Sequence, residues 1–220
     1  MIVSDRELIK SSGKAAYPNV NCLYSTIPRE MRMHMYRVSW YAQALFEKAK
    51  EVGIWDNTLP EEIFTYSQDI FQLHDIGRHY IPVDIYNKVE ELTEEEKEEI
   101  KRHTVYGLRA EKSVFFPFFP EHIIPYFRDV ATMHHERYDG TGYPYGKKGK
   151  EIPFMARICA VADAYDGMVS WKTYREGMSR EQAFAILKKE SGRQFQPELV
   201  ECFLQCKKEI ERIDIMMNGK

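Results

Sequence analysis

Apolar residues recur along this chain at the three- and four-residue spacing of helices, whereas the alternating pattern of strands is scarce. Thr93 with Glu96, and Ser179 with Gln182, have the spacing of helix-capping boxes. Pro28 can open a further helix, because a proline in the first turn gives up only a donor that has no partner there. The sequence therefore predicts an all-α fold, a single-domain helical bundle of about seven helices.

Short connections separate the expected helices, and no repeat or low-complexity tract interrupts them. We expect helices over these approximate ranges: 28–52, 60–75, 93–113, 127–135, 153–169, 179–192 and from 197 onward. The expected domain division is an N-terminal segment 1–27 of unknown role, a helical domain 28–214 and a C-terminal tail 215–220.

The composition excludes two classes of partner. A net charge of −3 offers no basic face for duplex nucleic acid. No apolar run approaches the roughly 20 residues that span a bilayer, and Met1–Lys10 lacks the hydrophobic segment of a signal peptide. We therefore expect a cytoplasmic protein with neither a membrane nor a duplex nucleic acid as partner.

Several polar residues interrupt the apolar pattern. Glu30 and His34 lie four residues apart and so share one face of their helix. The dipeptide His74–Asp75 closes the second expected helix, and His103 lies on the expected core face of the third. Taken singly, these features have ordinary explanations as a surface pair, an uninformative dipeptide and a hydrogen-bonded core histidine.

Asp163 is harder to explain structurally, because it lies inside the apolar run ICAVADAYDGMV. Burying an unpaired carboxylate there would cost on the order of several kcal/mol, so it needs a cation or strong donors. A buried multinuclear metal centre would account for all of the unexplained polar residues together. The set comprises five histidines and three carboxylates: His34, His74, His103, His134, His135, Glu30, Asp75 and Asp163.

The residue types of this set restrict the chemistry. Imidazole and carboxylate ligands without thiolate favour iron or manganese, with zinc as an alternative. Two such cations about 3.5–4 Å apart would hold a hydroxide at neutral pH and bind the oxygens of an in-line phosphoryl displacement. The sequence therefore points to hydrolysis of a phosphodiester.

Five motifs stand in the order and spacing of a known family. They are HDIGRHYIP at 74–82, HTVYG at 103–107, HHERYDGTGYP at 134–144, EIPFMARI at 151–158 and VADAYD at 161–166. From about Glu30 to Cys202 the chain resembles the HD-GYP subclass of the HD-domain phosphohydrolases. The resemblance implies a helical phosphodiesterase that hydrolyses cyclic di-GMP to pGpG, GMP or both by attack of a metal-bridged hydroxide.

The resemblance also assigns roles to individual residues. It makes metal ligands of His74, Asp75, His103, His134, His135 and Asp163, and adds Glu30 and His34 for a third cation. Its catalytic residues are His74, Asp75 and Arg78. Its substrate-binding residues are Arg78, Tyr143, Lys172 and Arg175, with the loop Gly142–Tyr143–Pro144 beside the nucleotide. The implied cofactors are two or three divalent ions, iron or manganese in the first place and zinc as the alternative.

Several positions depart from the family pattern. The family usually has lysine where this chain has Arg78, which keeps the charge but is longer and donates no proton at neutral pH. The family commonly has Arg-Pro-Tyr followed by Arg or Lys, whereas this chain reads KTYR at 172–175. Lys172 and Arg175 keep the two charges, and the proline is absent. Gln196 replaces an aspartate, and residues 88–91 read KVEE where the family has a KPG turn. These changes are compatible with phosphate binding and leave the shape of that turn open.

Alternatives to hydrolysis of cyclic di-GMP stay open. The substrate could be 3′,3′-cyclic GMP-AMP or a linear nucleotide, although the intact GYP block favours a cyclic one. The chain could instead be a receptor whose ligand is cyclic di-GMP or the diguanylate cyclase (GGDEF-type) domain of a partner, and which cleaves nothing. Such modules usually lose metal ligands. Family members often carry a sensor or receiver domain, for which 1–27 is too short, so the protein acts alone or the sequence is part of a longer chain.

Overall fold

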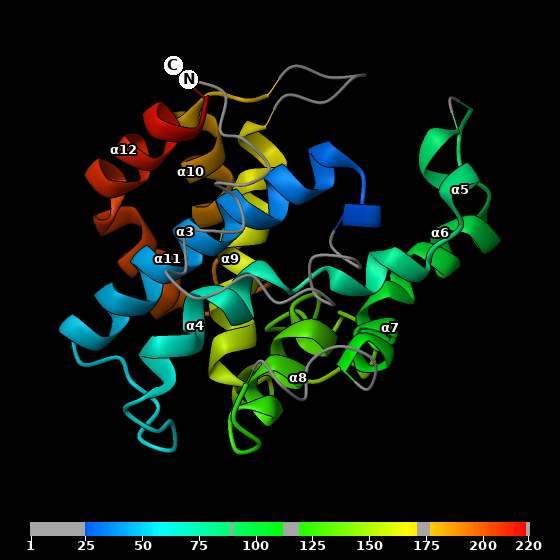
Figure 1. Cartoon of the computed structure of the whole chain (residues 1–220). Coiled ribbons are helices and arrows are strands. Elements are labelled where there is room, and N and C mark those ends of the chain that lie inside the picture. The colour runs from blue at the N-terminus through cyan, green and yellow to red at the C-terminus, as the bar shows by residue number, and fades with distance from the viewer. Residues whose placement is uncertain (1–24, 89, 112–118, 171–176, 219–220) are drawn as a thin grey trace.

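The computed structural model of the protein describes residues 25–88, 90–111, 119–170 and 177–218 (Figure 1). Within these ranges the regular structure is helical, apart from an isolated bridge between Ser191 and Phe195. No helix in this part of the chain is both long and apolar enough to cross a bilayer. The predicted all-α class is confirmed.

The helices follow one another through short connections. The longer ones are α3 (Arg29–Glu51), α4 (Ile63–Gln72), α6 (Glu94–Lys101), α7 (His103–Ala110), α8 (Ile124–Met133), α9 (Phe154–Val169), α10 (Arg180–Lys189), α11 (Pro197–Gln205) and α12 (Lys207–Asn218). Shorter pieces between them are the 3₁₀ helices η1 (Ile76–Tyr80) and η3 (Gly149–Glu151) and the helix α5 (Val83–Asn87).

Helix α9 forms the centre of the bundle. Every residue from Phe154 to Ala162 is buried, as expected for a helix that is apolar all round. Helix α3 packs along α9, and α8, α10 and α11 also contact it (Figure 1). On the other side of α3 lies α4, and η1 packs against α7. The polar residues that follow on α9, Asp163 and Asp166, are therefore enclosed by neighbouring helices.

The predicted capping boxes are both present. The Thr93 hydroxyl accepts the backbone N–H of Glu96, and the Glu96 carboxylate accepts the backbone N–H of Thr93. Ser179 and Gln182 make the same reciprocal pair at the start of α10. Pro28 directly precedes the first residue of α3. The starts of these helices thus follow from local hydrogen bonding and backbone chemistry, as the sequence indicates.

The single helix predicted from Thr93 to about Ser113 is wrong, because it consists of α6 and α7 with a break at Arg102. The imidazole Nδ1 of His103 lies 2.6 Å from the carbonyl oxygen of Ile100 and bonds to it. This side-chain bond occupies a carbonyl at the end of α6, a common way to satisfy such groups. The break makes His103 the first residue of α7.

The last predicted helix is also two helices, α11 and α12, which meet at Cys206. The thiol of Cys206 contacts the carbonyl oxygen of Ala44 on α3 at 3.7 Å. The tail predicted at 215–220 begins inside α12, which continues to Asn218. Met217 is buried against the core. Met217 therefore packs as part of the bundle, whereas Ile215 and Met216 are exposed.

Gly77 provides a test of the contact between η1 and α7. A Cβ atom at this position would lie 2.0 Å from the carbonyl oxygen of His103 and 2.5 Å from the backbone nitrogen of Gly107. Because backbone must move to relieve this overlap, we expect Gly77→Ala to lower the free energy of unfolding by about 2 kcal/mol or more. Urea denaturation measures the change.

The matched control is Gly167→Ala in α9, where an added Cβ would meet no atom within 4 Å. Alanine is favoured over glycine inside a helix, so this variant should keep or gain stability, by up to about 1 kcal/mol. Equal stabilities of Gly77→Ala and the wild type would show that η1 and α7 do not pack this closely.

Candidate metal centre

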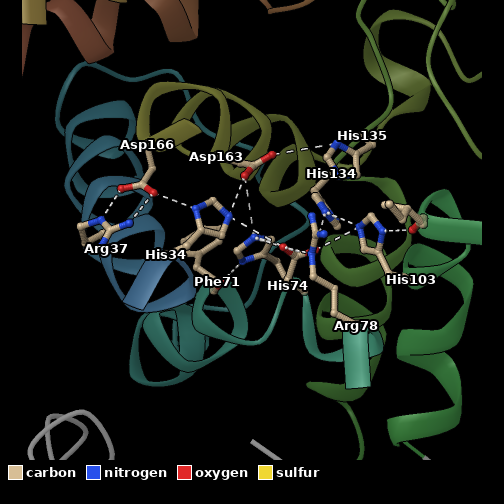
Figure 2. Close-up of polar contacts among 12 residues, drawn as sticks. His34, Arg37, Phe71, His74, Arg78, His103, His134, His135, Asp163 and Asp166 are labelled. Atoms are coloured by element: carbon tan, nitrogen blue, oxygen red, sulfur yellow. Dashed lines mark hydrogen bonds and ion pairs between the residues drawn. The ribbon is translucent and has the colours of Figure 1, made fainter. Parts of the chain in front are cut away.

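Two groups of side chains offer ligand atoms that lie within 4.8 Å of one another in each group (Figure 2). The first group is Asp75, His103, His134 and His135, and the second is His34, His74 and Asp163. They come from five segments: α3, the turn between α4 and η1, the start of α7, the end of α8, and α9. Seven of the eight predicted ligands are thus brought together.

Asp75 lies between the two groups. Its Oδ1 atom is 3.0 Å from Nε2 of His103 and 3.6 Å from Nε2 of His134. Its Oδ2 atom is 3.5 Å from Nε2 of His74 and 3.7 Å from Nε2 of His34. The side chain is 1% exposed, so each oxygen faces histidines rather than solvent.

Asp163 forms a second link between the groups. Its Oδ1 atom lies 3.1 Å from Nε2 of His34 and 4.0 Å from Nε2 of His74. Its Oδ2 atom lies 3.9 Å from Nδ1 of His135, which belongs to the other group. Two carboxylates that each face both sets of histidines are suited to hold neighbouring cations.

Three of the histidines are oriented by the backbone of their own segments. The Nδ1 atom of His74 lies 2.8 Å from the carbonyl oxygen of Phe71. The Nδ1 atoms of His103 and His134 lie 2.6 Å and 2.9 Å from the carbonyl oxygens of Ile100 and Val130. A carbonyl oxygen only accepts, so Nδ1 of each ring donates and carries the proton. The lone pair on Nε2 then points into the centre, the arrangement common to metal-binding histidines.

Two buried atoms of the centre have no hydrogen-bond partner among the residues that the structure describes. They are Nε2 of His74 and Oδ1 of Asp75. Unpaired buried polar atoms cost roughly 1–3 kcal/mol each, and native proteins seldom leave them without a purpose. A divalent cation would use both atoms as ligands. The residues present therefore fit a metal centre.

The protonation states also favour cations. Burial lowers the pKa values of His103 and His135, which keeps both imidazoles neutral. Burial alone would raise the pKa of Asp75, but Arg78 together with His74 and His103 outweighs burial and holds the pKa well below its ordinary value. The pKa of Asp163 is likewise lowered, because nearby histidines outweigh its burial. Neutral imidazole and ionised carboxylate are the forms that bind metal.

Arg37 and Asp166 belong to the site although the sequence reasoning missed them. The Asp166 carboxylate accepts from Nε of Arg37 at 2.6 Å, from a terminal nitrogen of Arg37 at 3.0 Å, and from Nδ1 of His34 at 2.7 Å (Figure 2). Each follows a predicted ligand by three residues, Arg37 after His34 and Asp166 after Asp163. Residues three apart share a helix face, which is the signal that could have identified them.

The GYP loop lies against the adjacent histidines. The ring of Tyr143 stacks on that of His135, with centroids 4.9 Å apart, and the Tyr143–Pro144 peptide bond is cis. A Cβ atom on Gly142 would lie 2.3 Å from the backbone nitrogen of Arg137, so only glycine allows this approach. The loop thus folds back onto the segment that carries the histidines.

Two carboxylates hold this loop in shape. Asp139 accepts the backbone N–H of Thr141 at 3.0 Å, which orders the turn. Glu136, which the sequence reasoning missed, is buried and accepts the backbone N–H groups of Tyr145 at 2.7 Å and Lys147 at 3.1 Å. Its place inside the motif HHERYDGTGYP was the available signal.

The remaining predicted residues have different positions. Glu30 is exposed in the first turn of α3 and belongs to neither group. Nε of Arg78 donates to Asp75 at 2.6 Å, so this arginine lies at the edge of the centre. Lys172 and Arg175 lie outside the described residues. The roles of all four stay predictions.

Residues 67–199 match the family described as "HD domain". The chain belongs to the HD domain family. The predicted membership is confirmed, and the two histidine groups form the candidate centre of this HD domain.

Relatives of this HD domain protein are named as phosphodiesterases of cyclic dinucleotides. The present chain is 38% identical to a cyclic di-GMP phosphodiesterase from Thermotoga maritima over 191 residues, 87% of this chain and 48% of that protein. It is 29% identical to 3′3′-cGAMP-specific phosphodiesterase 2 from Vibrio cholerae over 199 residues, 90% of this chain and 35% of that protein. The chain therefore spans half or less of the length of these relatives.

A solved structure shares the fold. An HDG"Y"P protein from Bdellovibrio bacteriovorus matches 80% of this chain and 51% of its own with a TM-score of 0.57. Its sequence identity is 22%, so the likeness concerns the fold alone.

The protonation of His34 predicts a pH dependence of metal binding. Burial lowers its pKa, but hydrogen bonds to Asp163 and Asp166 outweigh burial and raise it to about 9 in the metal-free protein. A metal must displace this proton, so affinity for the ion at His34 should rise about tenfold per pH unit below pKa 9. Titration calorimetry with Mn(II) in buffers of different ionisation enthalpy measures both the affinity and the released proton.

The variant His34→Ala removes the titrating group and serves as the control. It should lose the ion that shows this slope, and any ion it keeps should bind with a weaker pH dependence. An affinity of the wild type that is constant from about pH 6.5 to 8.5 would contradict the prediction.

Proposed function

We propose that this protein is a metal-dependent phosphodiesterase that hydrolyses a cyclic dinucleotide, with cyclic di-GMP as the first candidate and pGpG, GMP or both as products. The observation that carries the proposal is the pair of carboxylates, Asp75 and Asp163, each facing both histidine groups at 3.0–4.0 Å. Two adjoining groups of imidazole and carboxylate ligands are typical of centres that hydrolyse phosphate esters.

The proposed cofactors are two or three divalent cations, iron or manganese in the first place and zinc as the alternative. Seven residues would hold them: His34, His74, Asp75, His103, His134, His135 and Asp163. Glu30 stays a proposed eighth ligand, which would require its side chain to turn from solvent toward His34. When bound, the cations supply a hydroxide nucleophile at neutral pH and offset charge on the phosphoryl oxygens.

The protein's own groups would bind and orient the nucleotide. Arg78 is held through Nε by Asp75, which leaves its terminal N–H groups to donate to a phosphate oxygen in a fixed direction. Tyr143, stacked on His135, offers an aromatic face beside the centre for a guanine base. Lys172 and Arg175 are proposed as further phosphate contacts on the basis of the sequence resemblance.

The relatives support two substrates. Cyclic di-GMP is favoured by the relative from Thermotoga maritima at 38% identity, and 3′,3′-cyclic GMP-AMP by the relative from Vibrio cholerae at 29%. Both are rings with two phosphodiester bonds, and the described residues make no contact that would separate them. Cyclic di-GMP is therefore the first candidate and 3′,3′-cyclic GMP-AMP the second.

Replacement of His74 and Asp75 by alanine tests the proposed centre. The double variant removes one ligand from each group, including the carboxylate between them. We expect it to bind fewer ions per chain and to hydrolyse cyclic di-GMP at least about 100-fold more slowly, the loss that removal of a ligand's hydrogen-bond partner alone can cause. Elemental analysis of anaerobically purified protein and chromatography of the products give the two readouts.

The matched control removes a histidine and a carboxylate that pair on the surface, His122 and Glu62, whose side chains are 58% and 50% exposed. This double variant should keep the metal count and the rate of the wild type. Wild-type turnover by the His74/Asp75 variant would refute the assignment of the centre.

The substrate is tested by product analysis with cyclic di-GMP, 3′,3′-cyclic GMP-AMP and linear pGpG, each supplied to protein loaded with Fe(II) or Mn(II). We expect cleavage of a cyclic dinucleotide to exceed that of the linear one, because the intact GYP block of the sequence favours a cyclic substrate. Tight binding of cyclic di-GMP without any cleavage would instead identify a receptor.

A further inference from the structure

One of the five site histidines differs from the rest in the group that orients it. His74, His103 and His134 each donate Nδ1–H to a backbone carbonyl. His135 turns its Nδ1 toward Asp163, 3.9 Å away. His34 alone among the five pairs its Nδ1 with a carboxylate outside the two ligand groups, Oδ2 of Asp166 at 2.7 Å, and its Nε2 lies 3.1 Å from Asp163.

Asp166 is itself held in place by Arg37. Nε of Arg37 donates to Oδ1 at 2.6 Å and a terminal nitrogen donates to Oδ2 at 3.0 Å, a two-point contact that fixes the plane of the carboxylate. Oδ2 therefore accepts from Arg37 and from His34 at once (Figure 2). The Asp166 side chain is 1% exposed and that of Arg37 is 11% exposed, so water competes little for these bonds.

We propose that Asp166, clamped by Arg37, is a positioning residue that sets the tautomer of His34 and thereby controls whether a cation occupies the group formed by His34, His74 and Asp163. This inference rests on the proposed metal centre. An ionised carboxylate only accepts, so it fixes the His34 proton on Nδ1. Nε2 is then left with a lone pair that faces Asp163 and a cation between them.

Loss of the Asp166 charge would reverse this arrangement. Arg37 would keep its own charge, since an arginine side chain does not deprotonate in proteins. The guanidinium of Arg37 and an amide in place of the Asp166 carboxylate would then surround Nδ1 of His34, which favours Nδ1 as an acceptor. The proton then lies on Nε2, which can donate to Oδ1 of Asp163, 3.1 Å away. His34 and Asp163 are then joined by a hydrogen bond, and this pair no longer binds a cation.

The experiment compares Asp166→Asn with His34→Ala in the full chain loaded with Mn(II). We expect both variants to lose the same ion, so that each holds one fewer per chain than the wild type by elemental analysis. In titrations the affinity of that ion in Asp166→Asn should fall about 10- to 100-fold, the usual effect of removing a ligand's hydrogen-bond partner. The ions held by the other group should bind as in the wild type.

Asp214→Asn is the matched control for a merely structural effect. Asp214 is also a buried carboxylate, 6% exposed, that accepts from two tyrosines, Tyr41 and Tyr165, and from Arg180. These partners belong to neither ligand group. Asp214→Asn should therefore lower the stability of the fold and keep the wild-type ion count. Loss of the same ion from Asp214→Asn as from Asp166→Asn would overturn the specific role of Asp166.

Nitrogen-15 NMR of histidine-labelled protein reads the tautomer directly. In metal-free wild type near pH 10, above the His34 pKa of about 9, the proton should reside on Nδ1 of His34. In Asp166→Asn it should reside on Nε2, and His34→Ala identifies the signal. A proton that stays on Nδ1 in Asp166→Asn would overturn the proposal.

Asp166→Asn leaves Arg37 buried without its partner, which can prevent folding. The double variant Arg37→Met with Asp166→Asn removes both charges and should fold. Because no carboxylate then fixes the His34 proton on Nδ1, its affinity for the same ion should still fall. A wild-type ion count and affinity in either folded variant, together with loss of an ion from His34→Ala, would overturn this inference and leave the proposed function intact. A wild-type chain that binds no cation would overturn both.

Discussion

The organisation of the site depends on the burial of one carboxylate. Asp75 is almost fully removed from solvent, and its two oxygens face different sets of histidines. Arg78 supplies one positive charge to it through a bond of 2.6 Å. Isolating an ionised carboxylate in a protein interior is strongly unfavourable, so the surrounding helices must present either donors or cations to both oxygens. The histidines from α3, from the turn after α4, from the start of α7 and from the end of α8 converge on this carboxylate.

The bundle meets this requirement through backbone positions that few residues permit. Gly77 lets η1 approach the backbone of α7 at His103, and Gly142 lets the GYP loop return to the segment that follows α8. The break at Arg102 makes His103 the first residue of α7. Helix α9, buried all round in its first half, then brings Asp163 and Asp166 to the same region. The packing of the helices therefore also determines the geometry of the site.

The sequence predicts the helices best where local chemistry decides. The capping boxes at Thr93 and Ser179 formed as their spacing indicates. The breaks at Arg102 and Cys206 were missed because neither residue is a glycine or proline. The bond from His103 to Ile100 is local, whereas Cys206 contacts Ala44, 162 positions away. The motif histidines were predicted and do converge, whereas the Arg37–Asp166 pair joins residues 129 positions apart. The signal for such a pair was limited to spacing, because each member follows a predicted ligand by three residues on the same helix.

The different partners of the site histidines have a consequence for how the centre can diverge between lineages. A backbone carbonyl survives every side-chain substitution, so His74, His103 and His134 keep their orientation while neighbouring residues drift. His34 depends on Asp166, which a single codon change can remove. A substitution at Asp166 would therefore alter the environment of His34 while the backbone bonds of His74, His103 and His134 stay in place.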